Sequence, residues 1–400
     1  MAYAGHRQEG TNVPGELTHK RRIASILELD RRGFIKAGLA GAAGLTLSAC
    51  TSGAGEKSIT WGNWPYLLDY DPDAQTYPTL DEFIAESGIS VRYLEDIDDN
   101  NTFFAKIKDQ LSLNDFTGYD VITFTDWMNA RIIESGSVQQ FDRTNIPLVY
   151  ENTIDLFKSI IPNDPNRDFS VPWDAAGCGL VWNTELVPGG VHTLDDLLAP
   201  ELKGRVGLLS EWRFTMGVIM SGQGVDISGE WGDPEYERAL EWLDRAISDG
   251  HIANLLGNSY TIELERDNLL ASLGWSGDIA IMNAELGDRW TYEVPEFGAP
   301  FASDSLTIPN GTPEERKEWV EELANFYFDP TVAAHVAAYV GGITPVRGAQ
   351  EAMEKVDPTQ VENSSIFPDE TIVSRLKSYR RISDEEDVKY TTSFNKLLGL

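Results

Sequence analysis

The sequence contains few of the side chains that carry redox, metal or nucleophilic chemistry. Its 400 residues include two cysteines, Cys50 and Cys178, and five scattered histidines. No Gly-x-Ser-x-Gly, His-Glu-x-x-His or Cys-x-x-Cys motif occurs, so the signatures of lipase-type hydrolases, zinc proteases and thiol oxidoreductases are missing. Cys178 lies among small residues with no basic neighbour, which indicates a packed thiol rather than a nucleophile. We therefore expect no enzyme, no metal site and no cofactor.

Basic residues are scarce as well. The chain has 32 lysines and arginines against 64 aspartates and glutamates, a formal net charge of −32. Residues 1–50 carry seven basic and four acidic side chains, so residues 51–400 carry 25 and 60, a net charge of −35. Such a body repels nucleic acid and anionic lipid and attracts small cations. A binding site needs only a few acids. Most of the negative charge is therefore better explained by a surface that is adapted to salt or favours solubility.

Apolar runs long enough to span a bilayer are missing too. The run at residues 37–47 is too short, since a spanning helix needs about twenty apolar residues. It follows residues 30–36, Asp-Arg-Arg-Gly-Phe-Ile-Lys, which resemble the twin-arginine export motif, and it leads into Leu-Ser-Ala-Cys50, which resembles a lipoprotein cleavage box. These resemblances imply an export signal at residues 1–50, a lipid on the Cys50 sulfur and a Ser/Gly tether at residues 51–57. The alternative is a buried N-terminal helix with a chance cysteine.

The body of the chain alternates predicted strands and helices. With 42% apolar residues and many aromatic ones it can bury a large core, and its length predicts two or three domains. The alternation predicts a mostly parallel α/β sheet with ligand loops at its strand ends. Residues 170–183 interrupt it with small residues and a long apolar strand, which we interpret as a first crossing between two domains. The predicted strands cover residues 58–62, 89–94, 119–123, 205–209, 279–282 and 306–308, and the predicted helices cover residues 79–87, 102–113, 127–134, 215–222, 234–248, 262–272, 312–327, 331–339 and 369–397.

Two acids in residues 273–309 have no local structural explanation. Asp278 follows a Trp-Ser-Gly turn and precedes a short apolar run, and Asp304 lies in a predicted small-residue turn before another. Open α/β sheets bind ligands at such strand ends. Trp275 lies close to Asp278, and an aromatic face beside two carboxylates suits an alkyl ammonium. The alternative is that both acids are turn formers.

Short motifs follow one another in a fixed order along almost the whole body. They are Asn63-Trp64, Tyr119-Asp120-Val121-Ile122, Val171-Pro172-Trp173, Asn183, Glu201-Leu202-Lys203-Gly204-Arg205, Trp275-Ser276-Gly277-Asp278, Asp304-Ser305-Leu306-Thr307-Ile308-Pro309, Phe328-Asp329-Pro330-Thr331-Val332-Ala333 and Thr344-Pro345. Each is weakly specific alone, but in this order they resemble the spermidine/putrescine substrate-binding proteins of ABC importers.

This resemblance implies an α/β fold with two lobes, the type II periplasmic binding protein fold, in which two crossings join the lobes and the ligand lies in the cleft between them. The second crossing is expected near residues 302–304. One lobe is expected to contain residues 58–177 and 304–347, and the other residues 178–303 and 348–400.

The resemblance also implies which side chains contact the ligand. Asp278 and Asp304 are expected to hold one ammonium group of a polyamine, and Glu211 with Thr125 the other. Tryptophan rings are expected to cover the alkyl chain between them. The full set is Trp64, Thr125, Trp127, Glu211, Ser259, Trp275, Asp278 and Asp304.

Three positions depart from the family pattern. Where spermidine binders have an acid and two aromatic residues, this chain has Phe214, Ala302 and Gly342. The smaller aromatic box favours a short diamine such as putrescine over spermidine, and it leaves room for another cationic amine.

We therefore expect a monomeric, lipid-anchored protein in the periplasm or on the outer face of the cytoplasmic membrane, where it binds a polyamine and delivers it to the permease subunits of an ABC importer. Alternatives are a binding protein of the same fold for thiamine, iron or a sugar. An exported hydrolase is a remote alternative, because paired acids also occur in glycosidases.

Overall fold

The structure is a computed structural model. It describes residues 57–399 apart from residues 98–99, 159–160, 162 and 258. The predicted export signal, the Cys50 lipidation site and tether residues 51–56 lie outside this part of the chain. No helix in the part described is long and apolar enough to cross a membrane.

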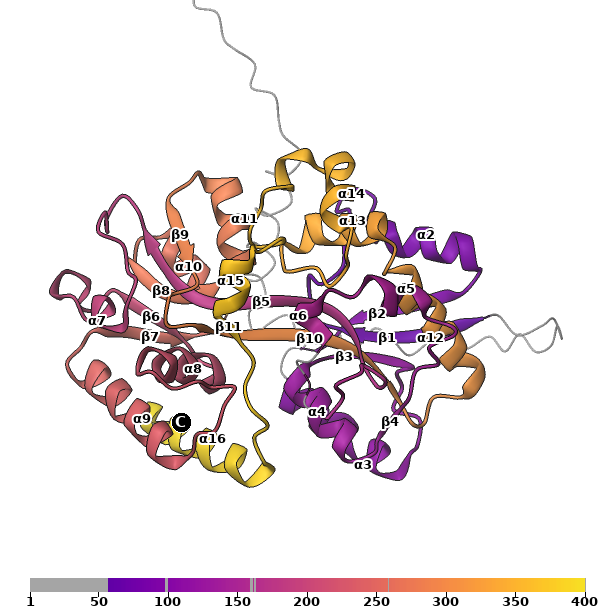
Figure 1. Cartoon of the computed structure of the whole chain (residues 1–400), viewed down its shortest axis with the longest axis horizontal. Coiled ribbons are helices and arrows are strands. Elements are labelled where there is room, and N and C mark those ends of the chain that lie inside the picture. The colour runs from indigo at the N-terminus through magenta and orange to yellow at the C-terminus, as the bar shows by residue number, and fades with distance from the viewer. Residues whose placement is uncertain (1–56, 98–99, 159–160, 162, 258, 400) are drawn as a thin grey trace, which may run out of the picture. The chain divides into compact units, whose positions relative to one another are not determined.

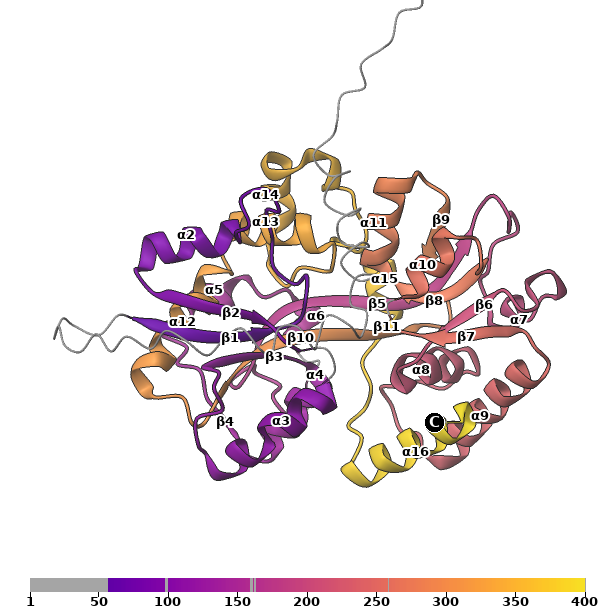
Figure 2. The same ribbon diagram turned by 180° about the vertical axis from the view of Figure 1, so that it is seen from behind.

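Eleven strands of the described residues form one continuous sheet (Figures 1 and 2). Its main path runs β2-β1-β3-β10-β5-β8-β6-β7; β4 and β11 pair with β10, and β9 pairs with β5. β1 is parallel to β2 and β3, and β6 is parallel to β7 and β8, as expected where helices connect successive strands. The strands are β1 (Ser58–Asn63), β2 (Ser90–Glu95), β3 (Val121–Thr125), β4 (Val138–Gln139), β5 (Val171–Asn183), β6 (Val206–Leu209), β7 (Ile252–Leu256), β8 (Ala271–Trp275), β9 (Trp290–Glu293), β10 (Ala299–Pro309) and β11 (Leu376–Lys377).

Strands β5 and β10 join the two parallel strand groups and lie side by side between them (Figure 1). β10 is antiparallel to β3 on one edge and to β5 on the other, and the second half of β5 pairs with β8. All residues of β5 except Asp174 and Ala176 are buried. The sheet therefore contains the two predicted crossings.

The helices pack on the sheet through apolar stripes. In α9, Tyr236, Ala239, Leu243 and Ala246 recur at helical spacing and are buried. Side chains of α8, α9 and α16 pack with the β8-β6-β7 group, and those of α12 and α13 pack with the β2-β1-β3 group. The helices are α2 (Pro78–Ser87), α3 (Asn100–Leu113), α4 (Asp126–Glu134), α5 (Pro147–Asn152), α6 (Asp155–Lys158), α7 (Leu194–Leu197), α8 (Trp212–Gly222), α9 (Asp233–Ser248), α10 (Tyr260–Glu265), α11 (Ser276–Leu286), α12 (Glu314–Phe326), α13 (Pro330–Val340), α14 (Ala349–Val356), α15 (Glu370–Arg375) and α16 (Asp384–Leu398), with 3₁₀ turns η2 (Pro200–Leu202) and η3 (Pro358–Gln360).

Three predicted elements are wrong in type or extent. The predicted helix 262–272 ends at Glu265, and its last residues belong to β8. The apolar run after Asp278, predicted as a strand, is part of helix α11. The predicted helix 369–397 is two helices, α15 and α16, separated by β11 and a non-helical stretch. Periodicity does not separate a short buried strand from a buried helix segment, and pairing with β5 selects the strand at β8.

Asp304 lies inside a strand and not in the predicted turn. It is near the middle of β10, where it pairs with Thr125 of β3 and Asp174 of β5. The two partner strands hydrogen-bond the backbone of β10 on both edges, which holds these small residues extended. Asp278 lies in the first turn of α11. The turn-former explanation therefore accounts for neither acid.

The lobe boundaries at residues 177, 303 and 347 remain predictions. Helix α14, which follows the last of them, packs against α13 through Met353 and Ala334.

A buried ion pair fixes the junction between β3, α4 and β10. Arg167 Nη2 lies 3.1 Å from Asp126 Oδ2, and both side chains are almost fully buried. Ser305 Oγ donates to the other oxygen of Asp126 at 2.6 Å, and Arg167 also donates to the Phe157 carbonyl oxygen at 2.7 Å. Because Asp126 directly follows Thr125, this network sets the position of Thr125 at the end of β3.

Breaking this pair on one side should be costly. Arg167→Met would leave the Asp126 carboxylate buried without a cation, and we expect the free energy of unfolding to fall by about 3–5 kcal/mol. Urea denaturation followed by tryptophan fluorescence measures this. The double variant Arg167→Met/Asp126→Asn should recover part of the loss, because no uncompensated charge remains. A loss below about 1 kcal/mol in the single variant would show that the pair is not important for stability.

Candidate functional site

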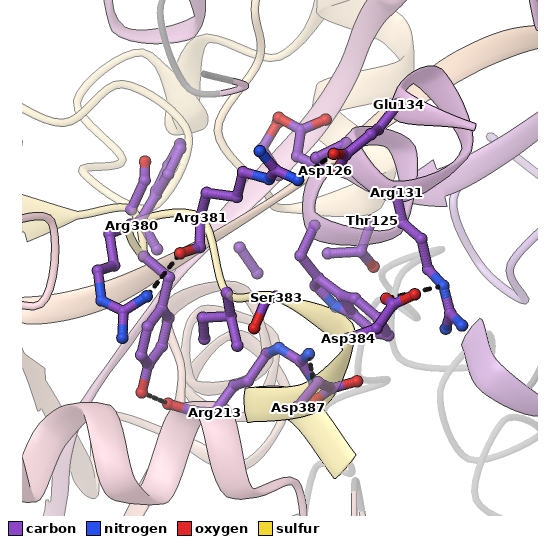
Figure 3. A pocket seen from close by; sticks show the side chains of 18 of the residues that line it. Thr125, Asp126, Arg131, Glu134, Arg213, Arg380, Arg381, Ser383, Asp384 and Asp387 are labelled. Atoms are coloured by element: carbon purple, nitrogen blue, oxygen red, sulfur yellow. Dashed lines mark hydrogen bonds and ion pairs between the residues drawn. The ribbon is translucent and has the colours of Figure 1, made fainter. Parts of the chain in front are cut away.

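A cavity of about 540 Å³ lies next to the crossing strands (Figure 3). Thr125 and Trp127 line it from the end of β3 and the start of α4, Arg213 and Phe214 line it from the start of α8, and residues 301–303 line it from β10. Residues before and within the first turn of α16 complete the wall. This volume falls in the range of small-molecule sites, and the cavity joins elements of both strand groups.

The charged side chains in the cavity wall neutralise one another. Several arginines point along the wall, and the ion pairs are drawn as dashed lines in Figure 3. The pairs are Arg131 with Asp384 at 3.4 Å, Arg213 with Asp387 at 2.6 Å, and Arg381 with Glu134. Since these arginines have acidic partners, this wall is not a strongly anionic surface. Acids free to bind a cation have to be sought elsewhere on the crossing strands.

The Trp127 ring already has a cationic neighbour. The guanidinium carbon of Arg213 lies 3.8 Å from the centre of the Trp127 ring and 4.8 Å from that of the Trp212 ring. Arg213 is 5% exposed, so it fills the space between the two indoles and contributes cation–π attraction. The face of Trp127 beside Arg213 is therefore occupied by a protein side chain.

Three polar side chains form a row across the sheet next to this cavity. Thr125, Asp304 and Asp174 are direct partners on β3, β10 and β5, and directly opposed side chains lie on the same face of a sheet. Thr125 Oγ1 donates to Asp304 Oδ1 at 2.8 Å, and Asn100 Nδ2 donates to Thr125 Oγ1 at 3.0 Å. All three members of the row are partly exposed. We call Thr125, Asp304 and Asp174 the carboxylate row.

The two acids of the row are electrostatically strained. Loss of hydration is the main cause that raises the pKa of Asp304 to about 7. The hydrogen bond from Thr125 acts in the opposite direction, and the nearby charges of Asp126 and Glu211 raise the pKa further. Desolvation and then the charge of Asp304 hold the pKa of Asp174 well above its usual range. Within the described chain, no lysine, arginine or histidine forms an ion pair with either acid. A bound cation would relieve this strain.

Asp278 and Trp275 form a second group, at the junction of β8 and α11. Tyr260 OH donates to Asp278 Oδ2 at 2.8 Å and accepts from the Trp275 backbone N–H at 2.9 Å. The Trp275 ring packs edge-on against Phe214, with ring centres 4.5 Å apart. Phe214 is a wall residue of the cavity, so this contact connects Trp275 to it.

The remaining predicted ligand contacts are Glu211, Ser259 and Trp64, and they lie on separate elements. Glu211 is exposed at the residue before α8, and its charge acts on both Asp304 and the buried thiol of Cys178. Ser259 is exposed just before α10. Trp64 packs on the hydrophobic cluster formed around α3 and β3, as Trp127 does. The structure thus brings Thr125, Asp304 and Glu211 into one electrostatic neighbourhood, whereas none of the described contacts connects Trp64 or Ser259 to it.

Sequence reasoning missed Asp174, Arg213 and Tyr260. Asp174 had a signal, because it is the only acid in a long apolar strand and nothing in that strand pairs with its charge. Arg213 and Tyr260 had none, since the ion pair of Arg213 with Asp387 and the hydrogen bond of Tyr260 to Asp278 join residues 174 and 18 positions apart. The prediction for Cys178 is confirmed: it is a free, buried thiol, and burial followed by the charge of Glu211 raises its pKa.

Comparison with known proteins gives a family and a fold. The family model described as bacterial extracellular solute-binding protein matches residues 79–363. The chain is 23% identical to the putrescine-binding periplasmic protein PotF of Escherichia coli over 377 residues, covering 90% of this chain and 96% of PotF. It is 24% identical to the putrescine-binding periplasmic protein SpuD of Pseudomonas aeruginosa, covering 88% of this chain and 96% of SpuD.

Solved structures agree with the fold. The crystal structure of the spermidine/putrescine ABC transporter substrate-binding protein PotD of Streptococcus pneumoniae superposes with a TM-score of 0.71 at 22% identity, covering 86% of this chain and 99% of that one. The PotD lipoprotein of Treponema pallidum gives a TM-score of 0.70 at 18% identity, covering 85% and 99%. The fold is therefore that of the type II periplasmic binding proteins, as predicted.

The raised pKa of Asp304 gives a pH dependence of stability. Between an unfolded-state pKa of about 3.9 and a folded-state value of about 7, the folded protein holds a proton that the unfolded chain releases. The contribution of Asp304 to stability therefore falls as pH rises through this window and is constant above it. Thermal melting from pH 5 to 8.5 should show a smaller decline in Asp304→Asn, which keeps the acceptor for Thr125. At pH 8 the variant should be at least as stable as the wild type; an equal loss of stability at every pH would contradict this assignment.

Proposed function

Because the chain belongs to the bacterial extracellular solute-binding protein family, we propose that it binds a polyamine, putrescine or spermidine, and delivers it to the permease of an ABC importer. The proteins of this family bind solutes, which favours a binding protein over an exported hydrolase. The names of PotF, SpuD and PotD supply the solute class, and the departures at Ala302 and Gly342 favour the shorter diamine.

The observation that carries the proposal is the carboxylate row. It places two acids side by side on the crossing strands, both partly exposed and neither paired with a basic residue in the part of the chain described. Two such charges destabilise the empty protein, and a small cation removes the repulsion. Sugars and other uncharged solutes cannot do this. A polyamine can, because each of its primary ammonium groups carries three N–H donors and a positive charge.

The binding mode follows from which acids lie together. The sequence-based prediction placed Asp304 with Asp278 on one ammonium group. Because Thr125 donates to Asp304 and Glu211 acts on the same acid, we instead assign one ammonium group to Thr125, Asp304 and Glu211. Asp278, oriented by Tyr260 beside Trp275, is assigned to the other. Trp64 and Trp127 remain predicted contacts of the alkyl chain, Trp127 through the part of its ring that Arg213 does not cover, and Ser259 remains a predicted ligand contact. Charge-assisted hydrogen bonds of about 1.5–3 kcal/mol each and aromatic contacts of about 0.5–2 kcal/mol reach micromolar affinity after ordering costs.

Transport requires that the permease distinguish the solute-bound protein from the empty protein. A solute that contacts both strand groups stabilises the arrangement in which they close around it, and the permease is expected to recognise that closed state. Binding and release then involve no chemical step. We expect the binding protein to act as a monomer.

The export route and the membrane anchor are part of the proposal. They rest on the order of the Arg-Arg motif, the short apolar run and Cys50 in the sequence. A lipid on Cys50 would keep the acidic body near the permease on the outer face of the cytoplasmic membrane, with residues 51–57 as the tether.

Isothermal titration of residues 51–400 with putrescine, spermidine and a panel of thiamine, ferric iron and sugars tests the solute class. We expect a dissociation constant of about 1 μM or lower for at least one polyamine. Asp304→Asn should weaken it about tenfold to a hundredfold, because one charge-assisted contact is lost. Asp109→Asn, which removes the same charge from an exposed position on α3, is the matched control and should bind normally. Heat with a sugar, thiamine or iron and none with any amine would overturn the proposal.

Expression of the full chain with Cys50→Ala tests the anchor. The wild-type protein should partition with the membrane fraction and carry added lipid mass, whereas the variant should be released in soluble form. Replacing Arg31 and Arg32 by lysine should leave the protein in the cytoplasm if the twin-arginine route is used. Equal partitioning of wild type and Cys50→Ala would refute lipidation at this residue.

A further inference from the structure

The first turn of α11 and the end of α13 meet without a side chain between them. A Cβ atom built on Gly277 of α11 would lie 2.8 Å from the carbonyl oxygen and 3.2 Å from the carbonyl carbon of Gly341, the residue that follows α13. Both glycines are buried. Figures 1 and 2 show the two helices on the same side of the crossing strands. We call this approach the glycine contact, and it leaves no room for a Cβ atom at position 277.

The chain at Gly341 is held on both sides of the glycine contact. The Gly341 N–H donates to the Ala337 carbonyl oxygen of α13 at 2.9 Å, and its φ of 72° lies in the left-handed region that favours glycine. Two residues later, the Ile343 N–H donates to the Ala175 carbonyl oxygen of β5 at 2.7 Å, and the Ala175 N–H donates back at 3.1 Å. Because this short loop is fixed at both ends, a side chain at position 277 would force α11 and α13 apart.

The glycine contact joins helices of different strand groups. Ile279 and Met282 of α11 belong to the hydrophobic cluster of the β8-β6-β7 group, whereas Val332 and Ala333 of α13 belong to that of the β2-β1-β3 group. Since the core residues of the two helices lie in separate clusters, the helices can move apart without opening either cluster. The glycine contact can therefore form and break as the two strand groups approach and separate.

Acids assigned to the solute flank the glycine contact on both sides. Gly277 directly precedes Asp278, which is assigned to one ammonium group. Gly342 directly follows Gly341 and lies against Asp174 of the carboxylate row, since a Cβ atom built on Gly342 would be 2.3 Å from Asp174 Oδ1. The closer α11 comes to this loop, the closer Asp278 comes to the carboxylate row.

We propose that Gly277 is a positioning residue for solute binding. Because position 277 carries no side chain, α11 approaches the Gly341 loop closely enough for Asp278 and the carboxylate row to hold one solute together. This inference rests on the proposed function, and it adds a residue that acts without touching the solute. The glycine contact belongs to the closed arrangement of the two strand groups. Affinity then depends on the fraction of molecules that can reach this arrangement.

Gly277→Ala tests this inference without changing a charge or removing a predicted ligand contact. In isothermal titrations of the full chain carrying Cys50→Ala, we expect the variant to bind putrescine and spermidine at least about tenfold more weakly, because fewer molecules reach the closed arrangement. The melting temperature of the unliganded variant should not fall, because the helices are apart in the empty protein and alanine is the better helix former.

Gly189→Ala is the matched control for the added methyl group. Gly189 is exposed, and a Cβ atom built on it would meet no atom within 4 Å. This variant should keep both the affinity and the melting temperature of the parent chain.

Spin labels measure the approach of the strand groups directly. Arg266→Cys, just after α10, and Glu351→Cys, on α14, place the labels at exposed positions, while Cys178 is buried. Leu264 of α10 packs in the same cluster as α11, and α14 packs on α13. We expect saturating putrescine or spermidine to shift the distance between the labels to shorter values in the parent chain, and to shift it less in Gly277→Ala.

The outcomes distinguish this inference from the proposed function. Unchanged polyamine affinity in Gly277→Ala would overturn the positioning role while polyamine binding stands. A lower melting temperature of the unliganded variant, or its failure to fold, would also overturn that role, because Gly277 would then serve static packing. No binding of either amine by the parent chain would overturn both.

Discussion

The antiparallel pairing of β5 with β10 is the constraint on which the rest of the structure depends. It turns two groups of parallel strands into one sheet, and it brings together segments that are far apart in the sequence. Through β10 it also reaches β3, whose last residue, Thr125, begins the carboxylate row. Backbone hydrogen bonds between the strands therefore set the positions of Asp304 and Asp174. What can change at these positions is the protonation of the two carboxyl groups and the ligand bound to them.

The acids near the crossing strands fall into two groups that differ in whether they have basic partners. In the cavity wall, arginines and acids compensate one another, and the Arg213 guanidinium is enclosed between two indole rings. In the carboxylate row the acids have no such partner among the described residues, and desolvation raises their pKa values. A net charge of −32 distributed over the surface attracts cations generally. Asp174 and Asp304, which have no basic partner among the described residues, are the acids that can select a particular cation.

Much of the fold followed from local patterns, whereas the site did not. The strand at 58–62, the helix at 234–248 and the crossing at 170–183 each had a periodicity or composition that determined their type. The apolar run after Asp278 and the small residues around Asp304 had no such signal, and tertiary pairing decided between helix, strand and turn. Asp304 was singled out for a wrong local reason, because it lies within β10 and not in a turn. Asp174 was passed over because its position opposite Asp304 comes from the pairing of β5 with β10.

The central claim is that the solute's positive charge is held by acids that are at least partly protonated at neutral pH when the site is empty. Calorimetry of polyamine binding at pH 7 in two buffers of different ionisation enthalpy counts the protons exchanged. The account predicts a net release of protons to the buffer, because a bound cation lowers the pKa of Asp304 from about 7, and it predicts less release in Asp304→Asn. Binding with no proton exchange in the wild type would show that the charge is held elsewhere.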